Sequence, residues 1–147
     1  MTIINSDNEK VYLANIKRFE EKYNVILPKE YKVFLLEYNG GDADPNVFSI
    51  SDEHGESALN ILYGLDAVSE YDDLSNVFDS LEGELPRELL SIGDDSGGNQ
   101  ICIGVSGKYV NKIYIWMHDV EEDEHMANVF LLSGNFNEFL ASLYEVE

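Results

Sequence analysis

Any chemistry in this sequence would rest first on its carboxylates, because 29 aspartates and glutamates stand against nine lysines and arginines. Carboxylates serve as metal ligands and as general acids or bases. The densest group with turn-forming neighbours is the run 94–99, which places two aspartates before two glycines and an asparagine. The run lacks the alternating acids and distal glutamate of a calcium-binding loop, so it predicts a tight acidic turn. With so many acids, close carboxylate pairs indicate no particular acid–base site.

The other reactive side chains also lack the pattern of a known site. His118 and His125 flank an acidic run without the spacing of a zinc motif, which favours surface histidines. Cys102 lies in the apolar run 101–105, where a thiol is typically buried and inert. The glycines within 93–98 lack a following Gly-Lys-Ser/Thr, and the two aspartates among them would repel a phosphate. We therefore predict no catalytic residue, no cofactor and no metal ion.

Trp116 is the remaining side chain of functional interest. On the predicted strand 113–118 it shares one face with Tyr114 and His118, and three apolar residues occupy the other face. Two interpretations stand open. Trp116 packs beneath the flanking helices, or the three side chains form an exposed ledge that anchors a partner.

The elements that must position these residues are helices at both ends of the chain with strands between them. Apolar spacing predicts helices over 12–23, 28–38, 70–82 and 136–143. Apolar runs predict strands over 47–50, 89–92, 101–105, 113–118 and 129–132, and 58–65 is a strand or another buried segment. We predict an α+β fold with one domain over residues 1–147. Its central antiparallel β-sheet has the N-terminal and C-terminal helices packed against it.

The segment 27–41 predicts the best-defined helix, because both of its ends are marked. Pro28 suits the first helical turn, where its missing N–H would have no partner anyway. Asn39, Gly40 and Gly41 accept the positive φ that commonly ends a helix. Between these ends, one apolar stripe is formed by Tyr31, Phe34, Leu35 and Tyr38.

Location is indicated by three features of the sequence. No run approaches the roughly 20 apolar residues of a membrane span. Residues 1–7 lack the basic region followed by an apolar one that marks a signal peptide. The chain has one cysteine, so no disulfide forms within it. We therefore expect a reducing, cytoplasmic location and no membrane partner.

The net charge of −20 is unevenly distributed along the chain. Residues 1–32 hold five of the 29 acids and six of the nine bases, so residues 33–147 hold 24 acids and three bases. Such a field repels nucleic acid and anionic membranes, and it attracts basic surfaces. Maintenance of solubility is the alternative explanation of this charge.

Two segments resemble the signatures of the SUKH superfamily, which includes a yeast regulator of cell-wall synthesis and many bacterial toxin-immunity proteins. The first is Leu-Pro-x-x-Tyr-x-x-Phe-Leu-x-x-Tyr-Asn-Gly-Gly at 27–41. The second begins at Ile92-Gly93, continues through the turn at Gly97-Gly98-Asn99 and ends on the strand that carries Trp116. Asn99 stands where the family often has aspartate. The resemblance extends from about residue 12 to the C-terminal helix.

This resemblance implies a non-enzymatic immunity protein that binds and neutralises a cognate secreted toxin, often a nuclease. It implies also that the motif residues build the fold. A nuclease has a basic cleft for phosphate, and an acidic domain attracted by its field would fit such a cleft. The candidate contacts are Trp116 and the acids predicted on loops: Asp42, Asp44, Asp94, Asp95, Asp119, Glu121, Glu122, Asp123 and Glu124. The alternative is a regulatory or scaffolding module that binds an endogenous protein.

Overall fold

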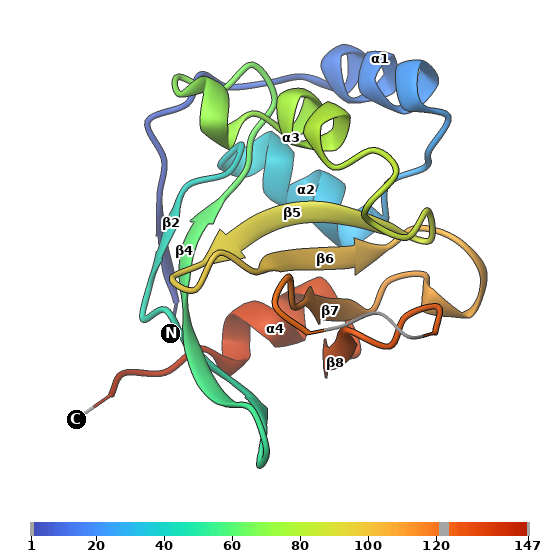
Figure 1. Cartoon of the computed structure of the whole chain (residues 1–147). Helices are drawn as coiled ribbons and strands as arrows, with labels where there is room; N and C mark the ends of the chain where they lie inside the picture. The colour runs from blue at the N-terminus through green and yellow to red at the C-terminus, as the bar shows by residue number, and fades with distance from the viewer. Residues whose placement is uncertain (1, 121–123, 147) are drawn as a thin grey trace.

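The computed structural model describes residues 2–120 and 124–146 and has the predicted α+β fold, with helices packed against an antiparallel sheet (Figure 1). The strands of this sheet are β3 (Val47–Ser51), β4 (Gly55–Leu62), β5 (Leu89–Asp95), β6 (Gln100–Gly104), β7 (Ile113–Trp116) and β8 (Val129–Ser133). The helices are α1 (Leu13–Tyr23), α2 (Lys29–Glu37), α3 (Leu74–Ser80) and α4 (Phe136–Ser142). Two 3-10 turns are η1 (Glu70–Asp72) and η2 (Gly107–Tyr109).

The strands of the sheet follow one another in chain order from β3 to β8, and each neighbouring pair is antiparallel. A separate ribbon pairs β1 (Ile3–Asn5) with β2 (Asp42–Asp44). The sheet curves until its two edges approach each other, and the His54 and Phe130 ring centroids lie 4.5 Å apart. The result is a nearly closed barrel with helices against it.

α2 begins and ends where the sequence predicts. Pro28 is its N-cap residue, and Asn39 follows the helix with a φ of 52°. Gly40 has a φ of 87°, and a Cβ atom there would lie 2.6 Å from the carbonyl oxygen of Leu62. The glycine therefore serves two purposes, because it turns the chain and lets the end of α2 approach β4 closely.

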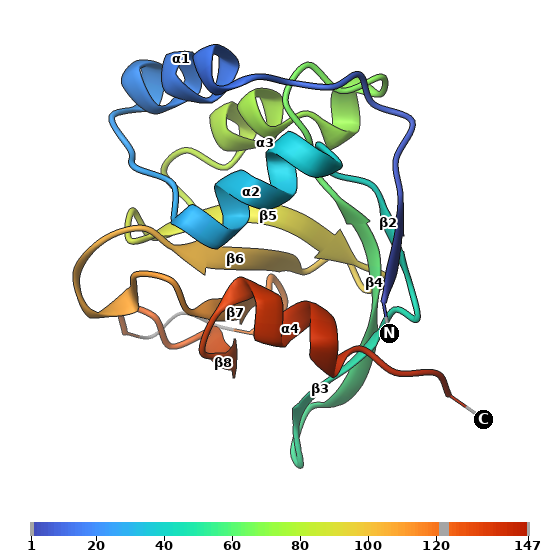
Figure 2. The ribbon, with the colours of Figure 1, turned by 180° about the vertical axis from the view of Figure 1, so that it is seen from behind.

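α2 and α4 lie on the same side of the sheet, as Figure 2 shows from behind, and the apolar stripe of α2 packs against α4. The Tyr31 and Phe34 rings lie 5.5 and 4.9 Å from the Phe136 ring. Tyr38 departs from the predicted stripe and is 41% exposed, because the helix ends at Glu37. Helices from the two ends of the sequence thus form one layer beneath the sheet.

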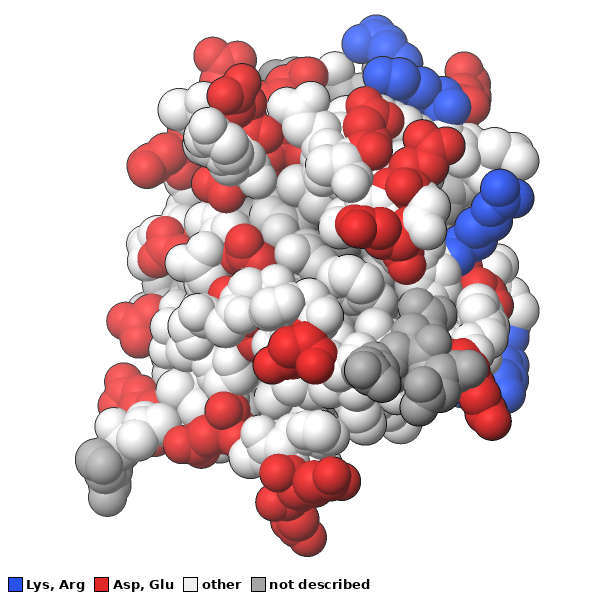
Figure 3. All heavy atoms as spheres, in the orientation of Figure 1, with Lys and Arg blue, Asp and Glu red and all other residues white. Residues whose placement is uncertain are grey.

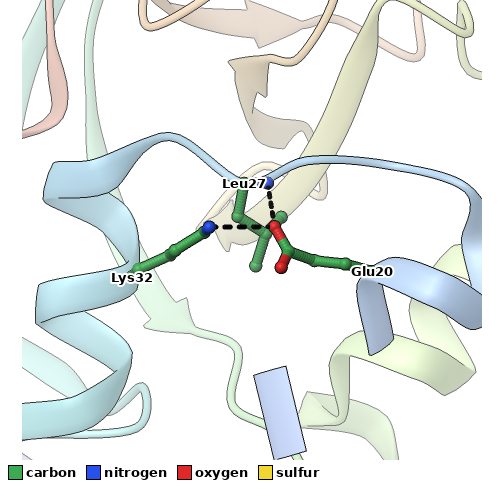
Figure 4. A network of polar contacts seen from close by, with 3 residues as sticks. All are labelled: Glu20, Leu27 and Lys32. Carbon is green, nitrogen blue, oxygen red and sulfur yellow. Dashed lines mark hydrogen bonds and ion pairs between the residues drawn. The ribbon is translucent and has the colours of Figure 1, made fainter. Parts of the chain in front are cut away.

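Glu20 of α1 fixes the connection to α2 (Figure 4). Its Oε2 atom accepts a 2.7 Å hydrogen bond from the Leu27 backbone N–H and lies 3.2 Å from Nζ of Lys32. This carboxylate is half-buried and has both a donor and a cation. Lys32 therefore neutralises the charge of Glu20 within the base-rich N-terminal region.

Two of the predicted helices differ from the structure at their starts. The expected stripe of the first helix includes Tyr12, but Tyr12 is the N-cap residue and is 62% exposed. The helix predicted over 70–82 is divided into η1 and α3 at Asp73. The Asp73 carboxylate accepts a hydrogen bond from the Asn76 N–H, so it caps α3 and ends the preceding turn.

The two faces of the sheet carry different apolar clusters. The main core packs the apolar face of β7, with Ile113 and Ile115, against the helices. A smaller cluster on the other face centres on Leu89, Cys102 and Tyr114. Residues from loops, from η2 and from the strands β7 and β8 complete this second cluster. Strand alternation explains the division, since successive side chains point to opposite faces.

Within the described part of the chain, no helix is long and apolar enough to cross a membrane.

Candidate partner-binding surface

The structure places the acids Asp42 and Asp44 on β2 rather than on the predicted turns, and both are exposed. Gly41, which precedes β2, bridges to Leu62 of β4, and Leu62 pairs with Gly93 of β5. The carboxylate-bearing segments that follow Gly41 and Gly93 are therefore separated by one strand. Tertiary pairing brings together acids that lie some fifty residues apart in the sequence.

Asp95 corrects the expectation of an exposed loop acid, because it ends β5 and is only 4% exposed. Its Oδ1 accepts hydrogen bonds from the backbone N–H groups of Gly97 and Asn99, at 3.0 and 2.7 Å. Its Oδ2 accepts from the Ser57 hydroxyl at 2.8 Å and the Asn99 amide at 3.1 Å. Both oxygens are engaged inside the protein. Asp95 therefore stabilises the β5–β6 turn and is no longer a candidate contact with a partner.

Asp94 remains a candidate, and it lies half-buried on β5. Its Oδ1 accepts a 2.9 Å hydrogen bond from the Asn60 side chain. Burial raises the pKa of the Asp94 carboxyl, and the negative charges of Asp72 and Asp95 raise it further against the Asn60 hydrogen bond. Burial also raises the pKa of Asp72. These acids therefore lie within electrostatic reach of one another.

A row of side chains crosses the sheet at this level, and we call it the polar row. Asp94 pairs across the strands with Gln100, and Gln100 pairs with Trp116. Asn60 joins the row at an irregularity in the β4–β5 pairing, which turns its amide toward Asp94. The polar row is thus Asn60, Asp94, Gln100 and Trp116.

Hydrogen bonds from buried residues hold the centre of the polar row. The side-chain oxygen of Gln100 accepts from the Tyr63 hydroxyl at 2.9 Å and the Ser91 hydroxyl at 2.6 Å. Tyr63 and Ser91 are 2% and 3% exposed. The pKa of Tyr63 is raised by burial first, and by the charges of Asp94 and Asp72. Hydrogen bonds from these buried residues therefore hold the centre of the polar row in a fixed arrangement.

Neither interpretation of Trp116 holds in full. The core-forming helices lie on the other face of the sheet, and Trp116 packs against the small cluster of Leu89, Cys102 and Tyr114. Tyr114 is buried at 8% exposure, so the three-residue ledge does not form. Trp116 itself is half-buried at the end of β7, and His118 is exposed beyond it. Trp116 therefore joins a small apolar cluster at the end of the polar row.

The remaining predicted contacts follow β7. Asp119 and Glu124 are exposed. Glu121, Glu122 and Asp123 lie outside the described residues. The nearby His125 lies 2.7 Å from the Glu88 carboxylate, and this hydrogen bond lowers the pKa of Glu88. The pair ties the segment after residue 124 to the start of β5.

The described residues include no group of three or more metal-ligating side chains. His118 instead contacts the Gly97 carbonyl at 2.9 Å through Nε2, and His125 contacts Glu88. Cys102 is fully buried, and burial raises the pKa of its thiol, which disfavours the reactive thiolate. The chemistry that this surface offers is non-covalent recognition by carboxylates, amides and aromatic rings.

Sequence reasoning missed most of the residues around Asp94. Asp72 lies within the helix predicted over 70–82 and was therefore not a candidate contact. The feature of the sequence that could have indicated it is the acidic pair that precedes the apolar run of α3. Asn60, Tyr63 and Gln100 carried no signal, because only the pairing of β4, β5 and β6 brings them together.

Figure 3 views the face of the sheet that is turned away from α2 and α4. Acidic side chains are spread over this face, and lysines and arginines lie along one margin. The polar row belongs to this face, because Gln100 and Trp116 alternate with the core-facing Ile101 and Ile115. The surface is therefore polar, acidic and uncovered by helices.

Comparison with known proteins identifies the family. A sequence model of the SMI1/KNR4 family (SUKH-1) matches residues 10–142. This chain belongs to that family. The predicted SUKH resemblance is thereby confirmed. One similar protein is the SPbeta prophage-derived uncharacterized protein YokK of Bacillus subtilis (strain 168), which is 25% identical over 147 aligned residues. The alignment covers 88% of this chain and 73% of YokK.

SUKH proteins are in general immunity-like or regulatory proteins rather than enzymes. The structure agrees with the implied role of the motif in the fold. Of the motif residues, Tyr31, Phe34 and Leu35 are buried in the core, and Gly40 turns the chain beside β4. The family motif therefore builds the framework, and the acidic face lies on other residues.

Proposed function

We propose that this protein is a cytoplasmic immunity protein that binds and neutralises a cognate toxin, without catalysing a reaction itself. The toxin would be a nuclease with a basic surface. The observation that carries the proposal is the helix-free acidic face, present on a domain whose family is generally immunity-like.

The mechanism would be occlusion of the nucleic-acid site. A nuclease cleft holds cations where phosphates bind, so an acidic protein surface competes for the same groups. Residues 33–147 hold 24 acids and three bases, which gives the protein a long-range field toward such a cleft. Charge complementarity of this kind mainly raises the association rate and selects the partner.

Co-expression with the toxin encoded beside this gene tests the proposal. We expect growth to be restored when this protein is produced with that toxin, and not when it is produced with an unrelated nuclease toxin. A failure to neutralise any neighbouring toxin would refute the immunity function. A stable endogenous partner found in the same cells would then favour the regulatory alternative.

The electrostatic mechanism has a separate test in the association kinetics of the purified pair. We expect the association rate to fall by about tenfold between 50 and 300 mM NaCl, because salt screens the steering field. The dissociation rate should change less. An association rate that is independent of salt would remove the electrostatic mechanism and leave immunity itself standing.

A further inference from the structure

The face of the sheet opposite α2 and α4 lacks a helical cover, although the sheet crosses the centre of the protein (Figures 1 and 2). Loops cover its apolar half, around Leu89, Cys102 and Tyr114. The other half carries the polar row and stays accessible at Asp94, Gln100 and Trp116, which are all half-buried. This half is an unpartnered polar sheet face.

The side chains of this face are fixed before any partner arrives. Gln100 is held by Tyr63 and Ser91, and Asp94 is held by Asn60. Asp94 uses Oδ1 for this bond, at 2.9 Å. A surface with ordered side chains loses little conformational entropy when a partner binds.

The acids of this face lack the cations that neutralise acids elsewhere. The described ion pairs join Lys32 to Glu20 and His125 to Glu88, and neither includes Asp72 or Asp94. The backbone carbonyl of Asp72 accepts a 3.0 Å hydrogen bond from the Gly64 N–H just beyond β4, which places η1 beside the sheet, and there the charges of Asp72 and Asp94 oppose one another. A cation from outside would relieve this repulsion. The face is therefore complementary to a basic partner.

The aromatic residues beside these acids favour arginine over lysine. Tyr71 adjoins Asp72 in η1 and is 79% exposed, and Trp116 ends the polar row. A guanidinium group binds carboxylates through two parallel N–H bonds and stacks on aromatic rings. An ammonium group offers neither the planar fork nor the stacking surface.

We propose that the partner docks on this face of the sheet, opposite α2 and α4, with an arginine of its basic surface seated against Asp94 and Asp72 beside Gln100 and Trp116. The inference rests on the proposed function, because it locates the interface and names the partner's contacting group. A second copy of this chain fits poorly, since two surfaces of the same acidic sign repel each other.

The test uses the intact protein and a synthetic penta-arginine peptide, followed by two-dimensional amide NMR. We expect shift changes centred on the polar row, the Trp116 indole and Asp72. The double variant D72N/D94N should bind about tenfold more weakly, because charge-assisted hydrogen bonds become neutral. Pentalysine should bind more weakly than penta-arginine to the unmodified protein.

The matched control is E37Q/E138Q, which removes two charges from exposed residues on α2 and α4. It should retain affinity for penta-arginine within about twofold. Equal losses in both double variants would show diffuse attraction and overturn the proposal. Shift changes centred on another surface, or dimer formation through this face without peptide, would also overturn it. Amide spectra establish that each variant is folded.

The two proposals fail in different ways. If the cognate toxin is neutralised and D72N/D94N neutralises it equally well, the docking site is wrong and the immunity function stands. If no toxin is neutralised and penta-arginine still maps to the polar row, the immunity function is wrong and the docking face stands.

Discussion

Asp94 and Asp95 are neighbours in the sequence with opposite roles in the structure. Strand geometry directs successive side chains to opposite sides, so one carboxylate enters the turn and the other faces outward. Asp95 accepts four hydrogen bonds from three residues of its surroundings. The Asp94 carboxylate accepts a hydrogen bond from the Asn60 amide, and the charges of Asp72 and Asp95 act against its own. At the residue scale, an acid that stabilises the fold and an acid that is available to a partner are therefore neighbours in the sequence.

Replacing Asp95 by alanine should lower the free energy of unfolding by about 2–4 kcal/mol. The substitution leaves the backbone N–H groups of Gly97 and of the buried Asn99 without an acceptor. Urea unfolding monitored by circular dichroism measures the change. The control Asp42→Ala alters an exposed acid and should stay within about 0.5 kcal/mol of the unmodified protein. Equal stability of both variants would contradict the anchoring role of Asp95.

Replacing Asp94 by asparagine should stabilise the protein at pH 7 by the order of 0.5 kcal/mol. Burial raises the pKa of the folded-state carboxyl, so the folded protein holds this proton more tightly than the unfolded chain does. Ionisation of Asp94 therefore lowers stability as the pH rises through that folded-state pKa. The advantage of the variant should vanish below the unfolded pKa of 3.8.

Urea unfolding from pH 3 to pH 7 tests this dependence on the charge of Asp94. A variant that is less stable at pH 7, or that gains stability equally at every pH, would contradict it. A confirmed gain would show that this acid is retained at a site where it destabilises the fold, as is common for residues that serve binding.

At the element scale, the end of α2 is fixed by backbone contact. Gly40 and Gly83 have nearly the same φ, 87° and 88°, but different surroundings. A Cβ atom on Gly40 would meet the backbone of Leu62 and Tyr63, whereas one on Gly83 would meet nothing within 4 Å. Comparing substitutions at these two glycines therefore separates the free-energy cost of a positive φ from the cost of steric crowding.

We expect Gly83→Ala to lower the free energy of unfolding by about 1–2 kcal/mol, the cost of a positive φ in an L-residue. Gly40→Ala should lower it by at least about 3 kcal/mol, because the backbone of β4 must also shift. Thermal and urea unfolding measure both values. Similar losses in the two variants would show that close contact between the end of α2 and β4 adds no constraint.

At the scale of the whole molecule, charge acts on stability as well as on recognition. The net charge is −20, and bases are concentrated in residues 1–32, so most acids repel other acids. Raising NaCl from 20 to 300 mM should therefore raise the Tm by a few degrees, because salt screens this repulsion. Calorimetry measures the shift. An unchanged or lower Tm would show that self-repulsion contributes little to the stability.

The sequence by itself determined the class of fold, the positions of most elements and the family. These features depend on local signals, such as the periodicity of Tyr31, Phe34 and Leu35 and the turn residues that follow them. The sequence also determined the acidity that selects a basic partner, because net charge depends only on composition. The starts of α1 and α3 differ from the prediction, since the caps at Tyr12 and Asp73 depend on backbone geometry.

Only the tertiary structure decided which acids can meet a partner. Adjacent carboxylates such as Asp94 and Asp95 look alike in the sequence, and burial alone distinguishes them. The structure also decided that α2 and α4 leave the polar row uncovered, and that Asp72 and Asp94 act on one another. The physical reason is that strand pairing joins residues from distant parts of the chain. Local patterns do not encode which of those residues become neighbours.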